Sequence, residues 1–261
     1  MRLMIVRHGD PDYSIDSLTP KGWKEAELLA DRLCKLDVKA FYVSPLGRAK
    51  DTASFTLKRL EREAEEMKWM REFDAQISRP DAVGRTIVWD WLPADWTAVP
   101  AFYDQQSWSS HPLLRSGKTE HGDVRAEYDW VTGEFDKLLA KHGYERHGKI
   151  YRAVNANNDT IVLFCHFGLE CVLLSHLLGI SPMVLWHGFC AAPTSVTTLY
   201  TEERRRGIAA FRMASFGDIS HLYAANEEPA FAARFCECYD NPNERHDLFK
   251  KFFHSVQHFL F

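Results

Sequence analysis

The sequence predicts an α/β protein with an open, mainly parallel central sheet. Three short apolar runs have the length of buried strands, and a helical spacing of apolar residues follows each of them along the chain. The runs cover residues 3–6, 40–43 and 160–165. In such a sheet, ligands bind just beyond the carboxyl ends of the strands, so the residues after each run are the candidates for chemistry.

The other elements can be placed from capping signals and periodicity. Thr19 and Pro20 suit the N-cap and the first turn of a helix, and Gly179 suits the end of another. Helices are expected at about 20–35, from Gly47 onward, at about 123–142 and at about 166–179. Two further strands, at about 196–200 and 208–216, are expected to form a hairpin.

The segment between Glu72 and Asp159 has a different character. Its Trp, Phe and Tyr residues alternate with prolines, so it cannot form one regular element. We expect a single domain over residues 1–261 with an insertion at about 74–159, whose aromatic side chains either line a ligand cleft or form a local core. Near the C-terminus, an apolar stripe over 248–260 either packs on the same subunit or joins two subunits, so a homodimer is one expectation.

Composition and charge argue against several classes of partner. The formal net charge is −4, so no overall positive field attracts nucleic acid or a membrane surface. No apolar run approaches the roughly 20 residues that span a bilayer, and the N-terminus lacks a signal-peptide core, so a cytoplasmic location is expected. The six scattered cysteines predict reduced, buried thiols rather than a disulfide framework or a zinc site.

Two arginines and two histidines stand where the predicted strands end. Arg7 and His8 directly follow the first strand. Arg48 and His166 follow the second and the third. The planar fork of arginine N–H donors fits phosphate oxygens, so these side chains together predict a pocket for a dianion. Gly9, the next residue after His8, is expected to take a backbone conformation closed to other residues.

Two helices are expected to begin beside this pocket, near Gly47 and Gly168. Their first N–H groups and their positive dipole ends would add donors for a bound phosphate. The sequence has no glycine-rich loop of the P-loop type, so a nucleotide-cradling site is not expected.

The residues at these positions resemble the motifs of the histidine phosphatase superfamily, the phosphoglycerate mutase-like group. The matching positions are Arg7-His8-Gly9, Ser44-Pro45-Leu46-Gly47-Arg48-Ala49-Lys50-Asp51-Thr52-Ala53, Glu72, Cys165-His166, and Thr19-x-x-Gly22-x-x-Glu25-Ala26. They cover roughly residues 1–72 and 160–216. The resemblance implies a three-layer α/β/α fold with a mainly parallel sheet, in which the insertion forms a cap over the site. It also implies that the second helix ends near Leu60 and that a short strand lies around 66–70.

The same resemblance implies a phosphohistidine mechanism that requires no metal and no cofactor. His8 would attack phosphorus in line and become phosphorylated. Arg7, Arg48 and His166 would hold the equatorial oxygens and meet the charge of the transition state. Glu72 matches the family's proton donor, and the same carboxyl would then activate water. Asp10 and Asp74 are the alternative proton donors.

Three positions depart from the family's usual pattern. Asp10 replaces the glutamate that mutases carry after Arg-His-Gly, and Ser14 replaces an asparagine, which weakens the mutase interpretation. Ser14 can still donate to a phosphate oxygen, so it remains a candidate for substrate binding with Arg7, Arg48 and His166. Phe167 stands where glycine is common, and its ring is expected to form a wall of the pocket.

The leading hypothesis is therefore a metal-independent phosphomonoesterase whose partner is a small phosphorylated metabolite. The alternatives are a phosphoglycerate-type mutase, which must keep water from the phosphohistidine, and a non-catalytic phosphate-binding module. The insertion is expected to decide which metabolite is the substrate.

Overall fold

The computed structural model describes residues 1–232 and 234–241, which fall into two compact units, 1–230 and 231–261. In the second unit, the described residues form no helix or strand, and Arg234 lies over the ring of Phe231. The C-terminal stripe over 248–260, and with it the expected basis for a dimer, lies outside the described residues. The expectation of one domain over the whole chain stays a prediction.

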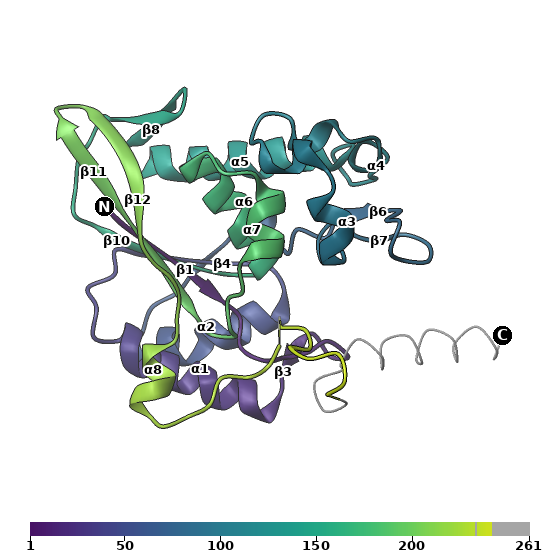
Figure 1. The fold of residues 1–261 in the computed structure, drawn as a ribbon. Coiled ribbons are helices and arrows are strands. Elements are labelled where there is room, and N and C mark those ends of the chain that lie inside the picture. The colour runs from purple at the N-terminus through teal and green to yellow at the C-terminus, as the bar shows by residue number, and fades with distance from the viewer. Residues whose placement is uncertain (233, 242–261) are drawn as a thin grey trace. The chain divides into compact units, whose positions relative to one another are not determined.

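An eight-stranded sheet forms the centre of the first unit, in the order β5-β4-β10-β1-β11-β12-β9-β8 (Figure 1). Its strands are β1 (Arg2–Arg7), β4 (Ala40–Val43), β5 (Glu65–Glu66), β8 (Tyr144–His147), β9 (Ile150–Ala153), β10 (Thr160–Cys165), β11 (Val196–Arg205) and β12 (Ile208–Asp218). From β5 to β1 the pairing is parallel, and from β1 to β8 it is antiparallel. Arg7 is in register with Cys165, so β1 and β10 end side by side. The residues that follow them, His8 and His166, therefore lie close together.

Helices cover both faces of this sheet, as Figure 1 shows. One layer contains α1 (Pro20–Leu33), α2 (Gly47–Leu60) and α8 (Ser220–Ala224), and the other contains α5 (Val124–Lys141), α6 (Phe167–Leu178) and α7 (Pro182–Gly188). Alternate residues of β1 face the two layers: Leu3 and Ile5 belong to one hydrophobic cluster, whereas Met4 and Val6 belong to the other. The predicted three-layer α/β/α fold is therefore confirmed.

Most predicted elements lie where the sequence placed them. Thr19 caps α1 by accepting from the backbone N–H of Gly22, and Gly179 ends α6 in the left-handed conformation with φ +70°. The expected strand at 66–70 is wrong in its extent, because β5 covers only Glu65–Glu66 and a 3-10 turn, η1 (Lys68–Met70), follows. The neighbours Trp69 and Met70 are both buried in one cluster, which a strand could not achieve because it alternates its side chains between faces.

The expected insertion contains two kinds of structure. Its first part consists of short elements, namely β6 (Gln76–Ile77), β7 (Thr86–Ile87), α3 (Pro93–Thr97), η2 (Pro100–Tyr103), η3 (Trp108–Ser110) and α4 (Pro112–Arg115). Its second part belongs to the main fold, because α5 covers the sheet and the β8–β9 hairpin extends it. Trp91, Phe102 and Trp108 are buried in the hydrophobic core, so these aromatic residues stabilise the first part rather than line a cleft.

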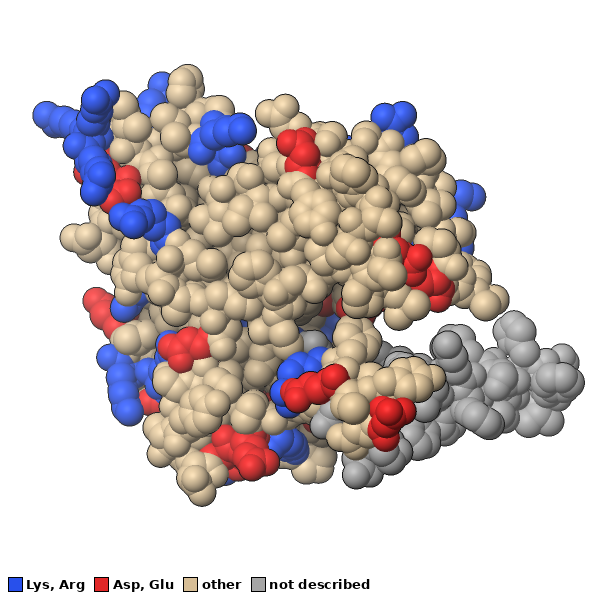
Figure 2. All heavy atoms as spheres, viewed as in Figure 1, with Lys and Arg blue, Asp and Glu red and all other residues tan. Residues whose placement is uncertain are grey.

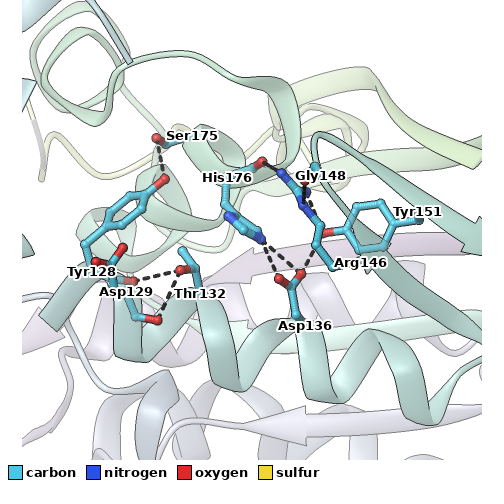
Figure 3. Close-up of polar contacts among 9 residues, drawn as sticks. All are labelled: Tyr128, Asp129, Thr132, Asp136, Arg146, Gly148, Tyr151, Ser175 and His176. Atoms are coloured by element: carbon cyan, nitrogen blue, oxygen red, sulfur yellow. Dashed lines mark hydrogen bonds and ion pairs between the residues drawn. The ribbon is translucent and has the colours of Figure 1, made fainter. Parts of the chain in front are cut away.

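A polar network joins α5, α6 and the β8–β9 hairpin (Figure 3). Asp136 on α5 lies at its centre, with both carboxylate oxygens 2.9 Å from His176 Nε2 on α6. The hydroxyl of Tyr151 donates to Asp136 Oδ1 at 2.8 Å and accepts from Arg146 Nη1 at 3.0 Å. The network fixes the hairpin to the helical layer, which explains why this part of the expected insertion completes the sheet.

The described surface carries charges of both signs. Figure 2 shows the largest group of cationic side chains at the upper left, where the β11–β12 hairpin ends in Figure 1. Arg204 and Arg212 in that hairpin both pair with Glu202, so part of this charge is neutralised locally. Within the described part of the chain, no helix has the length and apolar character needed to cross a membrane.

Cys34, Cys165, Cys171, Cys236 and Cys238 are free thiols, as expected. Cys165 and Cys171 are buried, but Cys190 and Cys238 are exposed, so the expectation of buried thiols is wrong for these two. Cys190 lies in the segment between α7 and β11, outside the buried ends of both elements.

Candidate active site

His8 follows the last residue of β1 and is almost fully buried. Its backbone N–H donates to the carbonyl of Cys165 at 3.0 Å, which ties it to the end of β10. Its ring Nδ1 lies 2.8 Å from the carbonyl oxygen of Gly9, an atom that can only accept, so Nδ1 carries the proton and Nε2 holds the lone pair. Burial, and next the positive charge of Arg7, hold the pKa of His8 well below its ordinary value, so the ring is a neutral nucleophile at pH 7.

His166 follows the last residue of β10 and lies beside His8. The two ring centroids are 5.1 Å apart, with the ring planes inclined at 55°. Ser44, at the end of β4, accepts from the N–H of Leu46, so its hydroxyl is free to donate to His166 Nε2 at 2.7 Å. Burial first, and then the neighbouring His8, Arg48 and Arg7, depress the pKa of His166 strongly. His166 Nδ1 is buried and has no hydrogen-bond partner among the described residues, which leaves this nitrogen for a ligand oxygen.

Arg7 is the last residue of β1, and 5% of it is exposed. Its Nη1 donates to the carbonyl oxygen of Ala191, which limits where the guanidinium can lie. The guanidinium carbon lies 6.0 Å from the ring centroid of Phe167, the first residue of α6. Phe167 therefore forms a wall beneath Arg7, the place that the sequence suggested for it.

Arg48, the second residue of α2, forms an ion pair with Asp16. Arg48 Nη1 lies 2.5 Å from Asp16 Oδ1, and its side chain is 11% exposed. The Nε of Arg48 is buried and has no hydrogen-bond partner in the described part of the chain. The other carboxylate oxygen of Asp16 accepts from the N–H of Gly47 at 2.7 Å. The expectation that this helix N-terminus offers its N–H to phosphate is therefore wrong at Gly47, because a carboxylate of the protein already occupies it.

Glu72 lies at the N-terminus of α6, close to Gly168. Its Oε1 accepts from the backbone N–H of Phe73 at 2.8 Å and of Leu169 at 3.0 Å. A Cβ on Gly168 would lie 2.6 Å from this oxygen and 2.8 Å from Nε1 of Trp89, so only glycine permits their approach. Burial raises the pKa of Glu72 despite these hydrogen bonds. This is the property that a proton donor near neutral pH needs.

The two alternative proton donors have less suitable environments. Asp74 is exposed to solvent. The Oδ2 of Asp10 accepts a hydrogen bond from the hydroxyl of Thr19 at 2.7 Å, which occupies the carboxylate with the cap of α1. Arg48 contributes to the electrostatic environment of Glu72, so Glu72 belongs to the same site as the cationic groups.

Ser14 does not join the other predicted residues. It is exposed in the turn between β2 (Pro11–Asp12) and β3 (Ser17–Leu18), and its hydroxyl donates to Asp12 at 2.5 Å. This hydrogen bond occupies the only proton donor of the Ser14 side chain within its own turn. The structure therefore brings together Arg7, His8, Arg48, Glu72, His166 and Phe167, but not Ser14.

The expectation for the backbone of Gly9 is also wrong. Its φ is not positive, and its importance is spatial, because a Cβ there would lie 2.8 Å from the carbonyl oxygen of Gly22. The first turn of α1 thus packs directly against the loop that follows His8. The N–H of Gly9 donates to the hydroxyl of Thr52 on α2 at 2.9 Å, which fixes the same loop from the other side.

Two residues near the site were missed from the sequence. Tyr13 is exposed, and its ring centroid lies 5.3 Å from the guanidinium carbon of Arg48. Glu170, on the first turn of α6, is almost fully buried and bonds Thr197, but its Oε1 has no hydrogen-bond partner among the residues that the structure describes. Tyr13 lies in an exposed turn and Glu170 in an apolar helix, and neither sequence pattern indicates a functional residue.

Replacing Glu170 with Gln is expected to remove a pH-dependent loss of stability. Burial raises the pKa of Glu170 from 4.5 to about 7, so the folded state binds a proton that the unfolded state has lost. The stability of the wild type is therefore complete below pH 4.5 and decreases as the pH rises to 7. Between pH 5.5 and 8, the free energy of unfolding of E170Q should rise relative to wild type by about 2 kcal/mol.

Urea unfolding at the two pH values measures this difference. Glu63, which is exposed on the surface, provides the matched control, and E63Q should track the wild type at both pH values. An E170Q variant that follows the wild-type pH dependence would contradict the prediction.

The fold and the grouped side chains define an α/β protein that presents a neutral histidine beside two arginines and a buried carboxyl, the arrangement of a phosphate-handling enzyme. The family model of the histidine phosphatase superfamily (branch 1) matches residues 3–81, which include four of these groups. Over this N-terminal segment the chain is similar to the histidine phosphatase superfamily, the family that its motifs resemble. This match agrees with the prediction of an enzyme of the phosphatase class.

Solved structures share the fold over most of the chain. A phosphoserine phosphatase of Entamoeba histolytica, solved with phosphoserine, is 20% identical, covers 85% of this chain and 98% of its own, and has a TM-score of 0.56. A mycobacterial glucosyl-3-phosphoglycerate phosphatase is 20% identical, with coverage of 83% and 98% and a TM-score of 0.53. A curated relative, the 2,3-bisphosphoglycerate-dependent phosphoglycerate mutase of Thermoplasma acidophilum, is 38% identical, but the match spans only 19% of this chain and 30% of the mutase.

Proposed function

We propose that this chain is a metal-independent phosphomonoesterase that hydrolyses a small phosphorylated metabolite through a phosphohistidine on His8. The observation that carries the proposal is the state of the His8 ring. Its Nδ1–H is committed to the carbonyl of Gly9, and its depressed pKa keeps Nε2 unprotonated. A neutral imidazole with its lone pair held at one nitrogen is ready for in-line attack on phosphorus.

The surrounding side chains supply what the two steps require. In the first step, Nε2 of His8 forms a bond to phosphorus while the bond to the ester oxygen breaks. Glu72 gives its proton to the leaving oxygen, and the raised pKa of its carboxyl favours the protonated form that this step needs. In the second step, Glu72 takes a proton from water as the water oxygen attacks phosphorus, and the nitrogen–phosphorus bond breaks.

The donors around phosphorus stabilise the charge of both transition states. Arg7 and Arg48 provide fixed guanidinium groups, and His166 provides its Nδ1, which has no other partner among the described residues. Donors held in place before the reaction stabilise a transition state without the cost of reorganisation. The likeness to phosphatases that act on phosphoserine and on glucosyl-3-phosphoglycerate supports a small phosphorylated metabolite as the substrate class.

Trapping the covalent intermediate tests the proposal. Rapid quenching during turnover of a radioactive phosphomonoester should leave phosphate on the protein that is labile to acid and stable to base, the signature of phosphohistidine. Peptide mapping should place it on His8, and EDTA should change neither the labelling nor the release of phosphate. A chain that binds the ester and leaves no covalent phosphate would instead be a binding module.

The match to a phosphoglycerate mutase keeps mutase activity as the second candidate. A mutase retains its phosphohistidine until a second substrate arrives, whereas a phosphatase passes the phosphate to water. Comparing the transfer of phosphate between the two phosphoglycerates with the release of inorganic phosphate separates these functions. The phosphatase proposal requires release to exceed transfer.

A further inference from the structure

The turn between β2 and β3 places a carboxylate directly on one of the phosphate-binding arginines. Asp16 is the last residue of this turn and has a φ of +49°, in the left-handed region that only a few residue types adopt readily. One oxygen of its carboxylate contacts Arg48 Nη1 at 2.5 Å, and the other accepts from the N–H of Gly47 at 2.7 Å. The two oxygens thus join the arginine side chain to the helix backbone that carries it.

Several independent contacts hold the turn in this place. The missing side chain of Gly47 makes room for it, because a Cβ there would lie 2.1 Å from the carbonyl oxygen of Asp16. On the next residue, the hydroxyl of Ser17 donates to Asp51 Oδ2 at 2.5 Å, one turn further along α2. Asp16 therefore approaches Arg48 from a turn that is fixed to α2 on both sides.

The contact uses only one side of the guanidinium. Arginine has five N–H donors in a planar fork, and Asp16 binds Nη1. The Nε of Arg48 is buried and has no hydrogen-bond partner among the described residues, so that edge of the fork is left for a ligand. The ring of Tyr13, from the start of the same turn, lies over the guanidinium with its centroid 5.3 Å away. The carboxylate and the ring together restrict a side chain that otherwise has many rotamers.

We propose that Asp16 is a positioning residue that holds Arg48 with its Nε edge toward the transferred phosphoryl group. This inference rests on the proposed function. Asp16 acts through Arg48 and does not touch phosphorus, and its contribution is the orientation of the guanidinium before the substrate arrives. Orientation of this kind affects rate strongly, because a misplacement of about 1 Å in a catalytic group can cost about 100-fold.

Asp16→Asn is the variant that isolates the charge of this carboxylate. Asparagine tolerates the left-handed backbone of position 16 and keeps an oxygen for the N–H of Gly47, but it loses the ion pair to Arg48. We expect kcat/KM for p-nitrophenyl phosphate to fall about 10-fold or more and the inhibition constant of inorganic phosphate to rise. Asp12→Asn is the matched control, since Asp12 lies in the same hairpin and its carboxylate accepts from the N–H and the hydroxyl of Ser14. Its kcat/KM should stay within about twofold of wild type, as for surface changes away from a site.

A double-mutant cycle separates positioning from a structural effect. In a chain that already carries Arg48→Lys, adding D16N should change kcat/KM by less than about twofold, because the group that Asp16 orients is gone. A purely structural role for Asp16 would give the same loss in both backgrounds, with a matching loss of thermal stability. That result would overturn the proposal.

Two further outcomes would also overturn it. Tighter inhibition by phosphate in D16N would mean that the carboxylate competes with the ligand for Arg48. Unchanged kcat/KM in D16N would mean that the ion pair between Asp16 and Arg48 does not contribute to the reaction. Neither outcome bears on the phosphohistidine, which the His8 labelling experiment tests separately, so the two proposals can fail independently.

Discussion

His8→Ala is expected to reduce the hydrolysis of phosphomonoesters by about 10⁴-fold or more, because it removes the atom that forms the covalent bond to phosphorus. Water would have to attack directly in a site arranged for a ring nitrogen. Release of phosphate from p-nitrophenyl phosphate at saturating substrate measures the effect. The binding of inorganic phosphate should survive, since the two arginines and His166 remain in place.

The control for this variant must separate the loss of a nucleophile from the loss of a buried histidine. His147→Ala removes an exposed imidazole at the end of β8 and should leave activity unchanged. Near-ultraviolet circular dichroism should show that H8A keeps its tertiary packing. Full activity in a folded H8A protein would end the proposal of a phosphohistidine mechanism.

Glu72→Gln is expected to have the second largest effect, and the effect should depend on the leaving group. For an alkyl phosphomonoester, the loss of the proton donor should lower kcat by about 10²- to 10⁴-fold. For p-nitrophenyl phosphate, whose leaving group needs little protonation, the loss in the first step should be much smaller. Steady-state rates on both substrates measure the ratio, and Asp74→Asn on the exposed alternative is the matched control.

The pH dependence gives the same prediction an independent test. Burial raises the pKa of Glu72, and the proton donor must be protonated, so activity on alkyl esters should fall as the pH rises through that pKa. The pKa of His8 is depressed well below 6.5, so protonation of the nucleophile should not limit activity until more acidic pH. In E72Q the alkaline decrease should disappear. An unchanged alkaline limb in E72Q, or an equal loss of activity in D74N, would assign the proton donor elsewhere.

The local signals in the sequence predicted much of the fold correctly. Short runs of buried residues can be recognised because a strand covered on both faces needs apolar side chains throughout, as in Thr160–Cys165. Caps can be recognised because they satisfy local hydrogen bonds, as at Thr19 and Gly179. The local pattern was not sufficient for residues 66–70. Their conformation depends on how Trp69 and Met70 pack against the hydrophobic core.

Part of the candidate site was predicted because its residues directly follow recognisable strands. His8 and His166 stand at strand ends, and neighbouring parallel strands bring their ends together. Asp16 and Glu170 gave no such signal, because the first lies in an exposed turn and the second in an apolar helix. Their importance arises from contacts with Arg48 and from burial near Arg7, which are properties of the folded chain.

The sequence by itself determined the main strands and helices that carry the site and the identity of the groups that can bind and attack phosphate. It could do so because strand, helix and cap signals act over a few residues, and because side-chain chemistry does not depend on the fold. Only the tertiary structure decided which nitrogen of His8 is free, that Asp16 rather than a ligand occupies the first N–H of α2, and that the hydroxyl of Ser14 donates to Asp12. These outcomes depend on distances between segments remote in the chain, and such distances are set by packing.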